Sequence, residues 1–285
     1  MFDLAPPLIS PARGTLPVIL SVPHSGRDYP AGLVTLAAAG RPALERLEDP
    51  LVDRLAWRAM AHGFGAVVAR APRAAIDCNR ALEEVDPAVV VGASRERLSA
   101  RTRGGLGLVP ARTRSDGFLW RRSIGRSELD RRIASAHRPY HEALASLLAE
   151  VVSDFGTALL LDLHSMPTPA ATVPPIVVGD AYGKSAARWL GAAALEVATR
   201  HGLAAQLNDP YAGGHIVERH GRPNAGVHAL QIEIDRALYL DADLYSDSGT
   251  AAAGPGFDAI ARLIEDLAIS LGRALSDRRL ATAAE

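Results

Sequence analysis

The segment that most constrains the fold is 159–167, in which three leucines lead into Asp162, a fourth leucine and His164 before a proline ends the pattern. A short apolar run bounded by turn residues is typical of a strand buried in a parallel sheet. Its polar residues come at the C-terminal end, which is the edge of an open α/β sheet where ligands bind. Segment 17–26 has the same design and delivers His24. Two such strands side by side would place two imidazoles in one pocket.

Strand-like apolar segments alternate along the chain with segments whose apolar residues recur at helical spacing. The expected strands are 17–22, 65–70, 158–163, 175–179, 203–207 and 228–234, and the expected helices are about 31–40, 50–62, 127–154, 184–201 and 256–276. Such alternation predicts an α/β fold with a mixed, mostly parallel sheet and helices on both faces. Pro139 falls inside the segment 127–154, where it either kinks the helix or opens a second one.

The composition shows no shift that would mark a domain boundary. We therefore expect the 285 residues to form a single α/β domain over 1–285. Residues 92–123 are rich in arginine and glycine and show little periodicity, which predicts a long loop region beside the active site. The C-terminal tail from about 278 is expected to fray.

Composition also excludes several classes of protein. The net charge of −1 gives no general attraction to nucleic acid or to acidic membranes, and no stretch approaches the roughly 20 apolar residues of a membrane span. A single cysteine, Cys78, rules out an internal disulfide, and the first residues lack the pattern of a secretory signal peptide. We therefore expect a cytoplasmic protein, and the oligomeric state stays open.

The two strand-end histidines suggest a metal site. Neutral imidazole is the commonest protein ligand for zinc, and a catalytic zinc keeps three protein ligands. Taken singly, each histidine is explained as well by a local hydrogen bond. The third ligand should be a carboxylate or a histidine, and Asp49 is weakly preferred over Glu48 and Asp53. Asp49 also precedes Pro50 as an N-cap precedes a helix, a role that does not exclude metal binding.

Two further motifs carry polar groups suited to hydrolysis. Asn79 and Arg80 form a pair that can hold a carboxylate, because a guanidinium offers two parallel hydrogen bonds and the amide adds a neutral donor. Glu233 lies inside the apolar strand 228–234, where a carboxylate is costly to bury unless it is paired or catalytic. Beside a zinc ion it can act as the general base that moves a proton from water to the leaving amine. A surface arginine and a buried ion pair are the structural alternatives.

Loop residues supply additional candidates for substrate binding. The segment 208–215 is a loop by composition, and its two consecutive glycines allow the backbone to approach a ligand closely. Contact with substrate and simple solvation are equally compatible with these features. The candidates from this loop, from the residues after it and from the long loop region are Tyr211, Arg219 and Arg112.

Other residues are expected to support the site from behind. Asp162 shares a strand face with His164, since side chains alternate along a strand, and is placed to orient the imidazole. Ser25 follows the first strand-end histidine. His137 and His141 are four residues apart but lack the glutamate of a zincin motif, so we expect them to be structural or to support the pocket.

Together these residues resemble the N-formylglutamate amidohydrolase family. The matching motifs run in the family's order over about residues 15–240 and comprise Val22-Pro23-His24-Ser25-Gly26, Asp49 to Leu55, Asp77-Cys78-Asn79-Arg80, Gly105-Leu106-Gly107 with Val109-Pro110, Pro139-Tyr140-His141, Asp162-Leu163-His164-Ser165-Met166, Asn208-Asp209-Pro210-Tyr211 with Gly213-Gly214, and Leu230-Gln231-Ile232-Glu233. No single motif is decisive, but together they are specific to the family.

The resemblance implies a phosphorylase/hydrolase-like α/β fold related to the zinc carboxypeptidases. It also implies metal-dependent hydrolysis of an N-acylated amino acid, typically N-formyl-glutamate to glutamate and formate in histidine breakdown. Carried over by position, it implies His24 and His164 as ligands of Zn²⁺ or another divalent metal, Glu233 as the base, and the Asn-Arg pair as the carboxylate clamp. The carboxypeptidases place a glutamate three residues after the first histidine, where this chain has Arg27. The third ligand must come from elsewhere, and Asp49 lies where this family has its acidic motif.

Two other functions compete with that of a zinc-type amidohydrolase. One is a non-catalytic α/β protein that binds an acidic metabolite through Arg80, with structural histidines. The other is a serine hydrolase that uses Ser25 or Ser165, although neither serine lies in a Gly-x-Ser-x-Gly elbow. Metal content and sensitivity to a chelator separate the three.

Overall fold

The structure is a computed structural model and describes residues 2–96, 98–113, 115–241 and 252–283. The chain forms two compact units. Unit 1 comprises Met1–Leu8, Pro23–Glu48 and Val68–Glu142, and unit 2 comprises Ile9–Val22, Asp49–Val67 and Ala143–Glu285. Neither unit is a continuous stretch of chain, and the expectation of a single domain over 1–285 stays a prediction.

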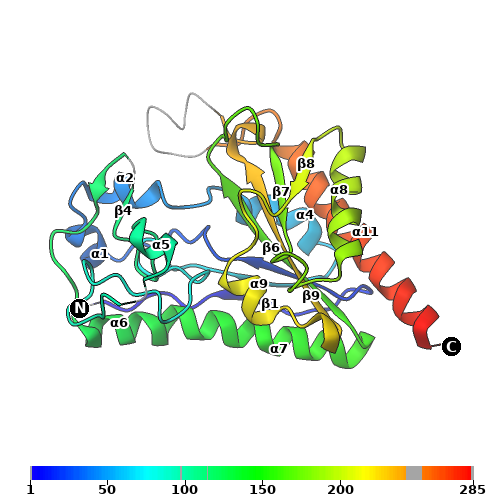
Figure 1. Ribbon diagram of the computed structural model, residues 1–285, viewed down its shortest axis with the longest axis horizontal. Helices are drawn as coiled ribbons and strands as arrows, with labels where there is room; N and C mark the ends of the chain where they lie inside the picture. The colour runs from blue at the N-terminus through cyan, green and yellow to red at the C-terminus, as the bar shows by residue number, and fades with distance from the viewer. Residues whose placement is uncertain (1, 97, 114, 242–251, 284–285) are drawn as a thin grey trace. The chain divides into compact units, whose positions relative to one another are not determined.

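Unit 2 is built on a seven-stranded sheet with the order β1-β3-β2-β6-β9-β7-β8 (Figure 1). The strands are β1 (Leu8–Ser10), β2 (Val18–Val22), β3 (Gly65–Val68), β6 (Ala158–Met166), β7 (Ile176–Gly179), β8 (Ala205–Leu207) and β9 (Val227–Asp235). β2, β6 and β9 are parallel neighbours, β7 runs antiparallel to β9, and β8 is parallel to β7. The expected α/β fold with a mixed, mostly parallel sheet is confirmed. Of the seven strands of this sheet, β1 is the one without a counterpart among the expected strands.

The long strand β6 carries polar side chains to one end of this sheet. All nine of its residues are buried, as expected for a strand covered on both faces. Its register places Ser21 of β2 opposite Asp162 and Glu233 of β9 opposite His164. Polar residues of three neighbouring strands therefore meet at the C-terminal end of β6.

Helices of unit 2 pack on one another and on the sheet. They include α3 (Val52–Leu55), α4 (Trp57–Met60), α8 (Arg188–Arg200), α9 (His215–His220) and α11 (Phe257–Ala283), with 3-10 turns η2 (Pro223–Ala225) and η3 (Arg236–Leu238). α11 contacts α3, α4, α8 and β6, whereas α9 contacts β6 and β9 (Figure 1). α11 is helical to Ala283, and 284–285 lie outside the described residues. The expectation of a frayed tail from about 278 stays a prediction.

The segment after Asp49 departs from the expected helix start. α3 begins at Val52, and its N-cap is Leu51, which adopts a left-handed φ of 59° and makes no side-chain cap bond. The expectation of Asp49 as N-cap is therefore wrong, and its carboxylate is available for other contacts. A left-handed conformation is costly for a bulky residue, so surrounding contacts must hold it.

Unit 1 has its own core of buried apolar residues, which includes Leu33, Leu108 and Trp120. Its elements are α1 (Ala31–Leu36), α2 (Gly40–Glu45), α5 (Ala100–Arg103), the hairpin strands β4 (Arg112–Thr113) and β5 (Gly117–Phe118), α6 (Arg126–Arg132), and the first residues of α7 (Arg138–Phe155). The region 92–123 consists mostly of loop around the short α5 and the β4–β5 hairpin, and it contributes residues to the core. The expectation of a long loop region beside the active site stays a prediction.

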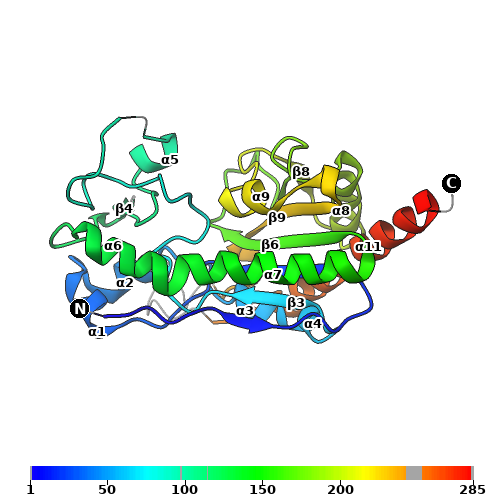
Figure 2. The ribbon, with the colours of Figure 1, turned by 90° about the horizontal axis from the view of Figure 1, so that it is seen from below.

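The helical stretch expected at 127–154 is present without a break. α6 passes into a π-helical turn, η1 (Ile133–His137), and then into α7, which Figure 2 shows as a long helix. Pro139 therefore neither ends the helix nor starts another. The π-turn precedes it because Pro139 has no N–H to donate to the helical ladder. No helix in the described part of the chain is both long and apolar enough to cross a membrane.

Candidate functional site

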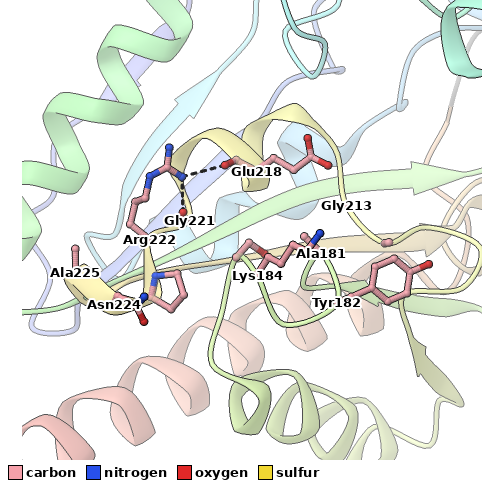
Figure 3. Close-up of a pocket in the computed structure, with 12 residues that line it drawn as sticks. Ala181, Tyr182, Lys184, Gly213, Glu218, Gly221, Arg222, Asn224 and Ala225 are labelled. Atoms are coloured by element: carbon pink, nitrogen blue, oxygen red, sulfur yellow. Dashed lines mark hydrogen bonds between the residues drawn. The ribbon is translucent and has the colours of Figure 1, made fainter. Parts of the chain in front are cut away.

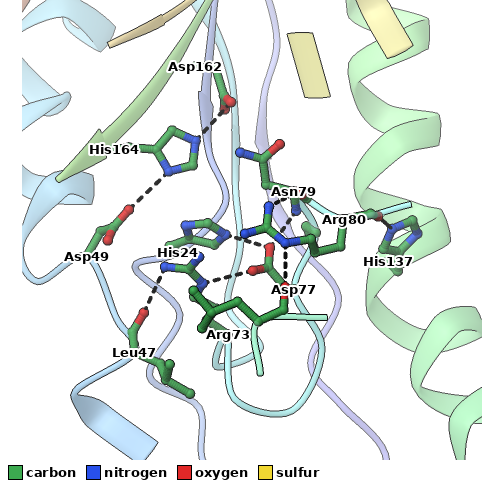
Figure 4. Close-up of polar contacts among 12 residues, drawn as sticks. His24, Leu47, Asp49, Arg73, Asp77, Asn79, Arg80, His137, Asp162 and His164 are labelled. Atoms are coloured by element: carbon green, nitrogen blue, oxygen red, sulfur yellow. Dashed lines mark hydrogen bonds and ion pairs between the residues drawn. The ribbon is translucent and has the colours of Figure 1, made fainter. Parts of the chain in front are cut away.

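His164 lies at the centre of a buried polar cluster in unit 2. Its Nε2 is 2.9 Å from Oδ2 of Asp162, and its Nδ1 is 3.1 Å from Oδ2 of Asp49 (Figure 4). Ser21 donates a hydrogen bond of 2.7 Å to the other oxygen of Asp162. The imidazole is therefore held between two carboxylates, one from its own strand face and one from the segment before α3.

Asp49 is held in place by residues that follow β9. Arg236 Nη2 lies 3.1 Å from Oδ1 of Asp49, the oxygen that does not face His164. The hydroxyl of Tyr239 donates a hydrogen bond of 2.8 Å to the carbonyl of Pro50. Both the side chain of Asp49 and the backbone after it are thus fixed from the end of β9.

The electrostatics of this cluster favour a cation between the carboxylates. Burial by itself would lower the pKa of His164, but the charge and hydrogen bond of Asp162, the hydrogen bond of Asp49 and the charge of Glu233 raise the pKa well above its usual value. Carboxylates around an imidazole thus stabilise positive charge at this position, which either a proton or a metal ion can supply.

The donor atoms of this cluster fit a metal ion. Zinc bound tetrahedrally by nitrogen and oxygen at about 2.0–2.2 Å keeps its ligand atoms about 3.3 Å apart, close to the 3.1 Å between His164 Nδ1 and Asp49 Oδ2. Asp162 contacts the opposite ring nitrogen, as the carboxylate partner of a metal-ligating histidine does. Asp49 and His164 therefore suit two positions of a metal site.

The two alternatives to Asp49 lie elsewhere. Glu48 belongs to unit 1, where its carboxylate accepts a hydrogen bond from the hydroxyl of Tyr29 and burial raises its pKa to about 7. Asp53 lies within α3 of unit 2. Among the described contacts within unit 2, Asp49 and Asp162 are the carboxylates that pair with His164.

Glu233 lies beside His164 on the neighbouring strand, as their paired register shows. The side-chain amide of Gln231 donates a hydrogen bond of 2.8 Å to Glu233 Oε1. Both residues are buried and share a strand face, since they are two apart. A buried carboxylate that has one oxygen held by an amide and lies beside an imidazole is placed to accept a proton.

His24 is the centre of a second polar cluster, which lies in unit 1. Its Nε2 is 2.7 Å from Oδ1 of Asp77, and Arg73 Nε donates to Oδ2 at 2.9 Å (Figure 4). Burial would raise the pKa of Asp77, but the charges of His24, Arg73 and Arg80 and the hydrogen bond of His24 hold it well below its usual value. Asp77 is therefore ionised, and its carboxylate orients the ring of His24. The sequence did not predict this role of Asp77.

Arg80 is buried in the same unit with part of its guanidinium unused. Its Nε donates to the carbonyl of Leu106 at 2.8 Å and its Nη1 to the carbonyl of Asn79 at 2.6 Å. Nη2 has no partner among the described residues. His137 donates to the Arg80 carbonyl at 2.8 Å, and the neighbouring His141 donates to that of Cys78 at 3.0 Å. These histidines thus support the segment that carries Asn79 and Arg80.

The remaining candidates lie at four further positions in the two units. Arg112 is exposed in β4 and donates to the carbonyl of Arg103. Arg219 is exposed on α9, and Tyr211 is half-buried in the loop before it. Ser25 is buried in unit 1 next to His24. The predicted roles of these four residues stay predictions.

A separate cleft of about 700 Å³ lies in unit 2 (Figure 3). Its lining comes from the turn after β7, from α9 and from η2, and includes Tyr182, Lys184, Glu218 and Arg222. No predicted ligand, base or carboxylate-binding residue lines it. The predicted site residues therefore lie in the polar clusters and outside the lining of this cleft.

The chain is similar to known proteins of one kind, in a family model and in individual relatives. The sequence model of the family N-formylglutamate amidohydrolase matches residues 16–240. An N-formylglutamate deformylase from Pseudomonas aeruginosa is 30% identical over 244 residues, which cover 82% of this chain and 86% of the relative. A protein of the same name from Pseudomonas putida is 28% identical over 247 residues, covering 80% and 84%.

A solved structure agrees with this result. The crystal structure of N-formylglutamate amidohydrolase from Ralstonia eutropha JMP134 is similar with a TM-score of 0.84 and 30% sequence identity, and the match covers 97% of this chain and 99% of that chain. The segment matched to the family contains every residue of the two polar clusters.

Proposed function

Because the chain belongs to the N-formylglutamate amidohydrolase family and is an amidohydrolase, we propose that it hydrolyses the amide of an N-acylated acidic amino acid, with N-formyl-glutamate as substrate and formate and glutamate as products. The observation that carries this proposal is the buried pair of His164 Nδ1 and Asp49 Oδ2, 3.1 Å apart, beside Glu233. A buried arrangement of acids around one histidine is typical of a hydrolytic metal site.

The proposed metal ligands are His24, Asp49 and His164, with zinc or another divalent ion as the metal. When bound, such an ion polarises the scissile carbonyl and makes a neighbouring water more acidic. Asp77 holds the Nε2 side of His24, and Asp162 holds the Nε2 side of His164. In each histidine the other nitrogen, Nδ1, is therefore the one proposed as ligand atom.

Glu233 is the proposed general base. It takes a proton from water, the resulting hydroxide attacks the formyl carbon, and the carbon–nitrogen bond breaks when Glu233 returns the proton to the leaving amine. Gln231 supports this role because its hydrogen bond to Oε1 fixes the orientation of the carboxylate. Water supplies the oxygen of formate, and glutamate leaves as the free amino acid.

Arg80 is the proposed anchor for a carboxylate of the substrate, with Asn79 beside it. The backbone carbonyls at its Nε and Nη1 fix the plane of the guanidinium. A substrate carboxylate at Nη2 would be positioned with respect to the amide to be cleaved. Arg112, Tyr211 and Arg219 are proposed as further contacts from the loops.

A screen of N-acyl amino acids tests this function. Purified protein should release formate from N-formyl-L-glutamate, should act more slowly on N-formyl-leucine, and should lose activity after dialysis against a chelator and regain it with Zn²⁺. Full activity in the chelator would contradict the metal site and favour the serine hydrolase. One of the two serines of that alternative, Ser165, accepts a hydrogen bond from Nε of Arg236 at 3.1 Å.

A further inference from the structure

We propose that Arg236 is a positioning residue that fixes Asp49 as a metal ligand through one oxygen only. This inference rests on the metal-dependent function proposed above. Neither the sequence motifs nor the comparisons assign a role to Arg236. It lies three residues beyond Glu233, in η3 directly after β9.

The contacts of Arg236 divide the two oxygens of Asp49 between different partners. Nη2 of Arg236 lies 3.1 Å from Oδ1, and Nδ1 of His164 lies 3.1 Å from Oδ2. The side chain of Asp49 is 2% exposed and that of Arg236 is 11% exposed, so solvent weakens this pair little. With Oδ1 bound to the guanidinium, only Oδ2 is directed toward the histidine and a metal beside it.

The guanidinium is itself held by a second anchor. Its Nε donates to the hydroxyl of Ser165 at 3.1 Å. Ser165 follows His164 in β6, so one planar group connects the strand of the histidine to the carboxylate. Arginine suits this position, because the nitrogens of its rigid fork reach two acceptors at once, whereas a lysine ammonium is a single point of charge.

The turn that carries Arg236 is fixed independently of that residue. Oδ1 of Asp235 accepts hydrogen bonds from the backbone N–H of Ala237 and from the hydroxyl of Thr168, each 2.9 Å long. Tyr239 from the same turn holds the carbonyl of Pro50. The chain after β9 therefore supports both the carboxylate of Asp49 and the strained backbone that follows it.

Loss of Arg236 should weaken metal binding without unfolding the protein. Residues that orient a metal ligand contribute about 10–100-fold to metal affinity. In Arg236→Gln the carboxylate of Asp49 is no longer held by a cation and can rotate or bind with both oxygens. We expect the dissociation constant for Zn²⁺ to rise by about 10–100-fold, with kcat at saturating Zn²⁺ reduced less than activity at limiting Zn²⁺.

The test compares Arg236→Gln, Arg236→Lys and a matched control, Arg58→Gln. Arg58 pairs with Glu265 in the same unit at 2.9 Å, but its side chain is 47% exposed. Zn²⁺ affinity is measured by competition with a chelating dye, and the thermal midpoint of the metal-free protein is measured for each variant. We expect Arg236→Lys to bind Zn²⁺ with an affinity between those of wild type and Arg236→Gln, and Arg58→Gln to match wild type.

Wild-type Zn²⁺ affinity in Arg236→Gln would overturn the inference. The inference would also be overturned if Arg236→Gln lowered the thermal midpoint of the metal-free protein and the loss of Zn²⁺ affinity were no larger than this loss of stability explains. The role of Arg236 would then be structural. Ser165→Ala serves as a second variant if Arg236→Gln does not fold. Its Zn²⁺ affinity should fall by about threefold. An unchanged affinity would contradict the role of the Ser165 hydroxyl in holding Arg236. A wild-type protein that binds no Zn²⁺ would instead contradict the proposed function.

Discussion

At the scale of single residues, His164 shows how two neighbours define the chemistry of an imidazole. Asp162 contacts Nε2, and Asp49 contacts Nδ1. One carboxylate shares its strand face and the other comes from a segment 115 residues away in sequence. The first contact orients the ring, whereas the second brings together two atoms that can bind the same metal ion.

Replacing Glu233 with Gln should separate proton transfer from metal binding. The amide has nearly the shape of the carboxylate but cannot accept a proton, and general base catalysis is worth roughly 10²–10⁴-fold in rate. We expect kcat to fall by about that factor, while the Zn²⁺ content, measured by elemental analysis, stays at the wild-type value. Gln231→Ala serves as control, since it removes one hydrogen bond to the carboxylate but keeps the base. Wild-type turnover in Glu233→Gln would disprove the assignment.

At the scale of elements, the ends of strands and short turns position the polar groups. β9 contributes Glu233 and continues into η3, whose Arg236 reaches Asp49. In unit 1 the hairpin β4–β5 is tied to the end of α2, where Nε and Nη2 of Arg46 donate to the two oxygens of Asp116 at 2.9 and 2.8 Å. This hairpin is too short to be stable alone, so such contacts hold it.

The pair of Arg46 and Asp116 predicts a pH-dependent contribution to stability. Hydrogen bonds from Arg46 lower the pKa of Asp116 to about 2, below the roughly 3.9 of an unfolded aspartate. Because the folded pKa is the lower one, the stabilisation is present above about pH 4 and is lost as the pH falls toward 2. Asp116→Asn should lower the free energy of unfolding by about 1 kcal/mol at pH 7, since Arg46 is half exposed.

Denaturant titrations at several pH values measure this effect. The difference between wild type and Asp116→Asn should be constant from about pH 5 to pH 7 and should shrink below about pH 4. Arg126→Gln is a suitable control, because Arg126 and Asp130 form an exposed ion pair within α6 and its loss should change stability by less than about 0.5 kcal/mol. A difference for Asp116→Asn that grows on acidification would contradict the assignment.

At the scale of the whole molecule, the chain passes several times between its two compact units. Each unit is assembled from segments that are distant in sequence, so neither corresponds to a continuous fragment of the chain. Each unit carries one of the polar clusters. The cluster of His164 lies on the sheet of unit 2, and the cluster of His24 lies in unit 1, which has an apolar core of its own.

Binding of the proposed metal should stabilise the folded protein. A ligand that binds the folded state alone, at 100 times its dissociation constant, adds about 2.7 kcal/mol, which corresponds to a rise of roughly 5 °C in Tm for a chain of this size. Calorimetry of metal-free protein with and without Zn²⁺ measures this shift. In His164→Ala the shift should be lost, whatever the Tm of the variant without metal. An equal shift in both proteins would place the stabilising ion elsewhere.

Much of the fold and part of the site are predictable from local patterns. The apolar run before His164 predicts a strand buried on both faces, since only such a strand needs consecutive apolar residues. Alternation of side chains places Asp162 and His164 on one face. Glu233 is conspicuous because a carboxylate in an apolar strand must have a partner or a role.

Which side chains from distant segments pair with one another depends on the tertiary structure. Asp49 reads locally as a helix cap, yet the chain at Leu51 turns left-handed, the helix starts at Val52 and the carboxylate contacts His164 instead. Asp77 pairs with His24, and Arg236 pairs with Asp49. No periodic pattern in the sequence predicts these pairs, because they join segments 53 and 187 residues apart. Local propensity determines strands, helices and the face on which each side chain lies, whereas the pairing of buried charges depends on how those elements pack in space.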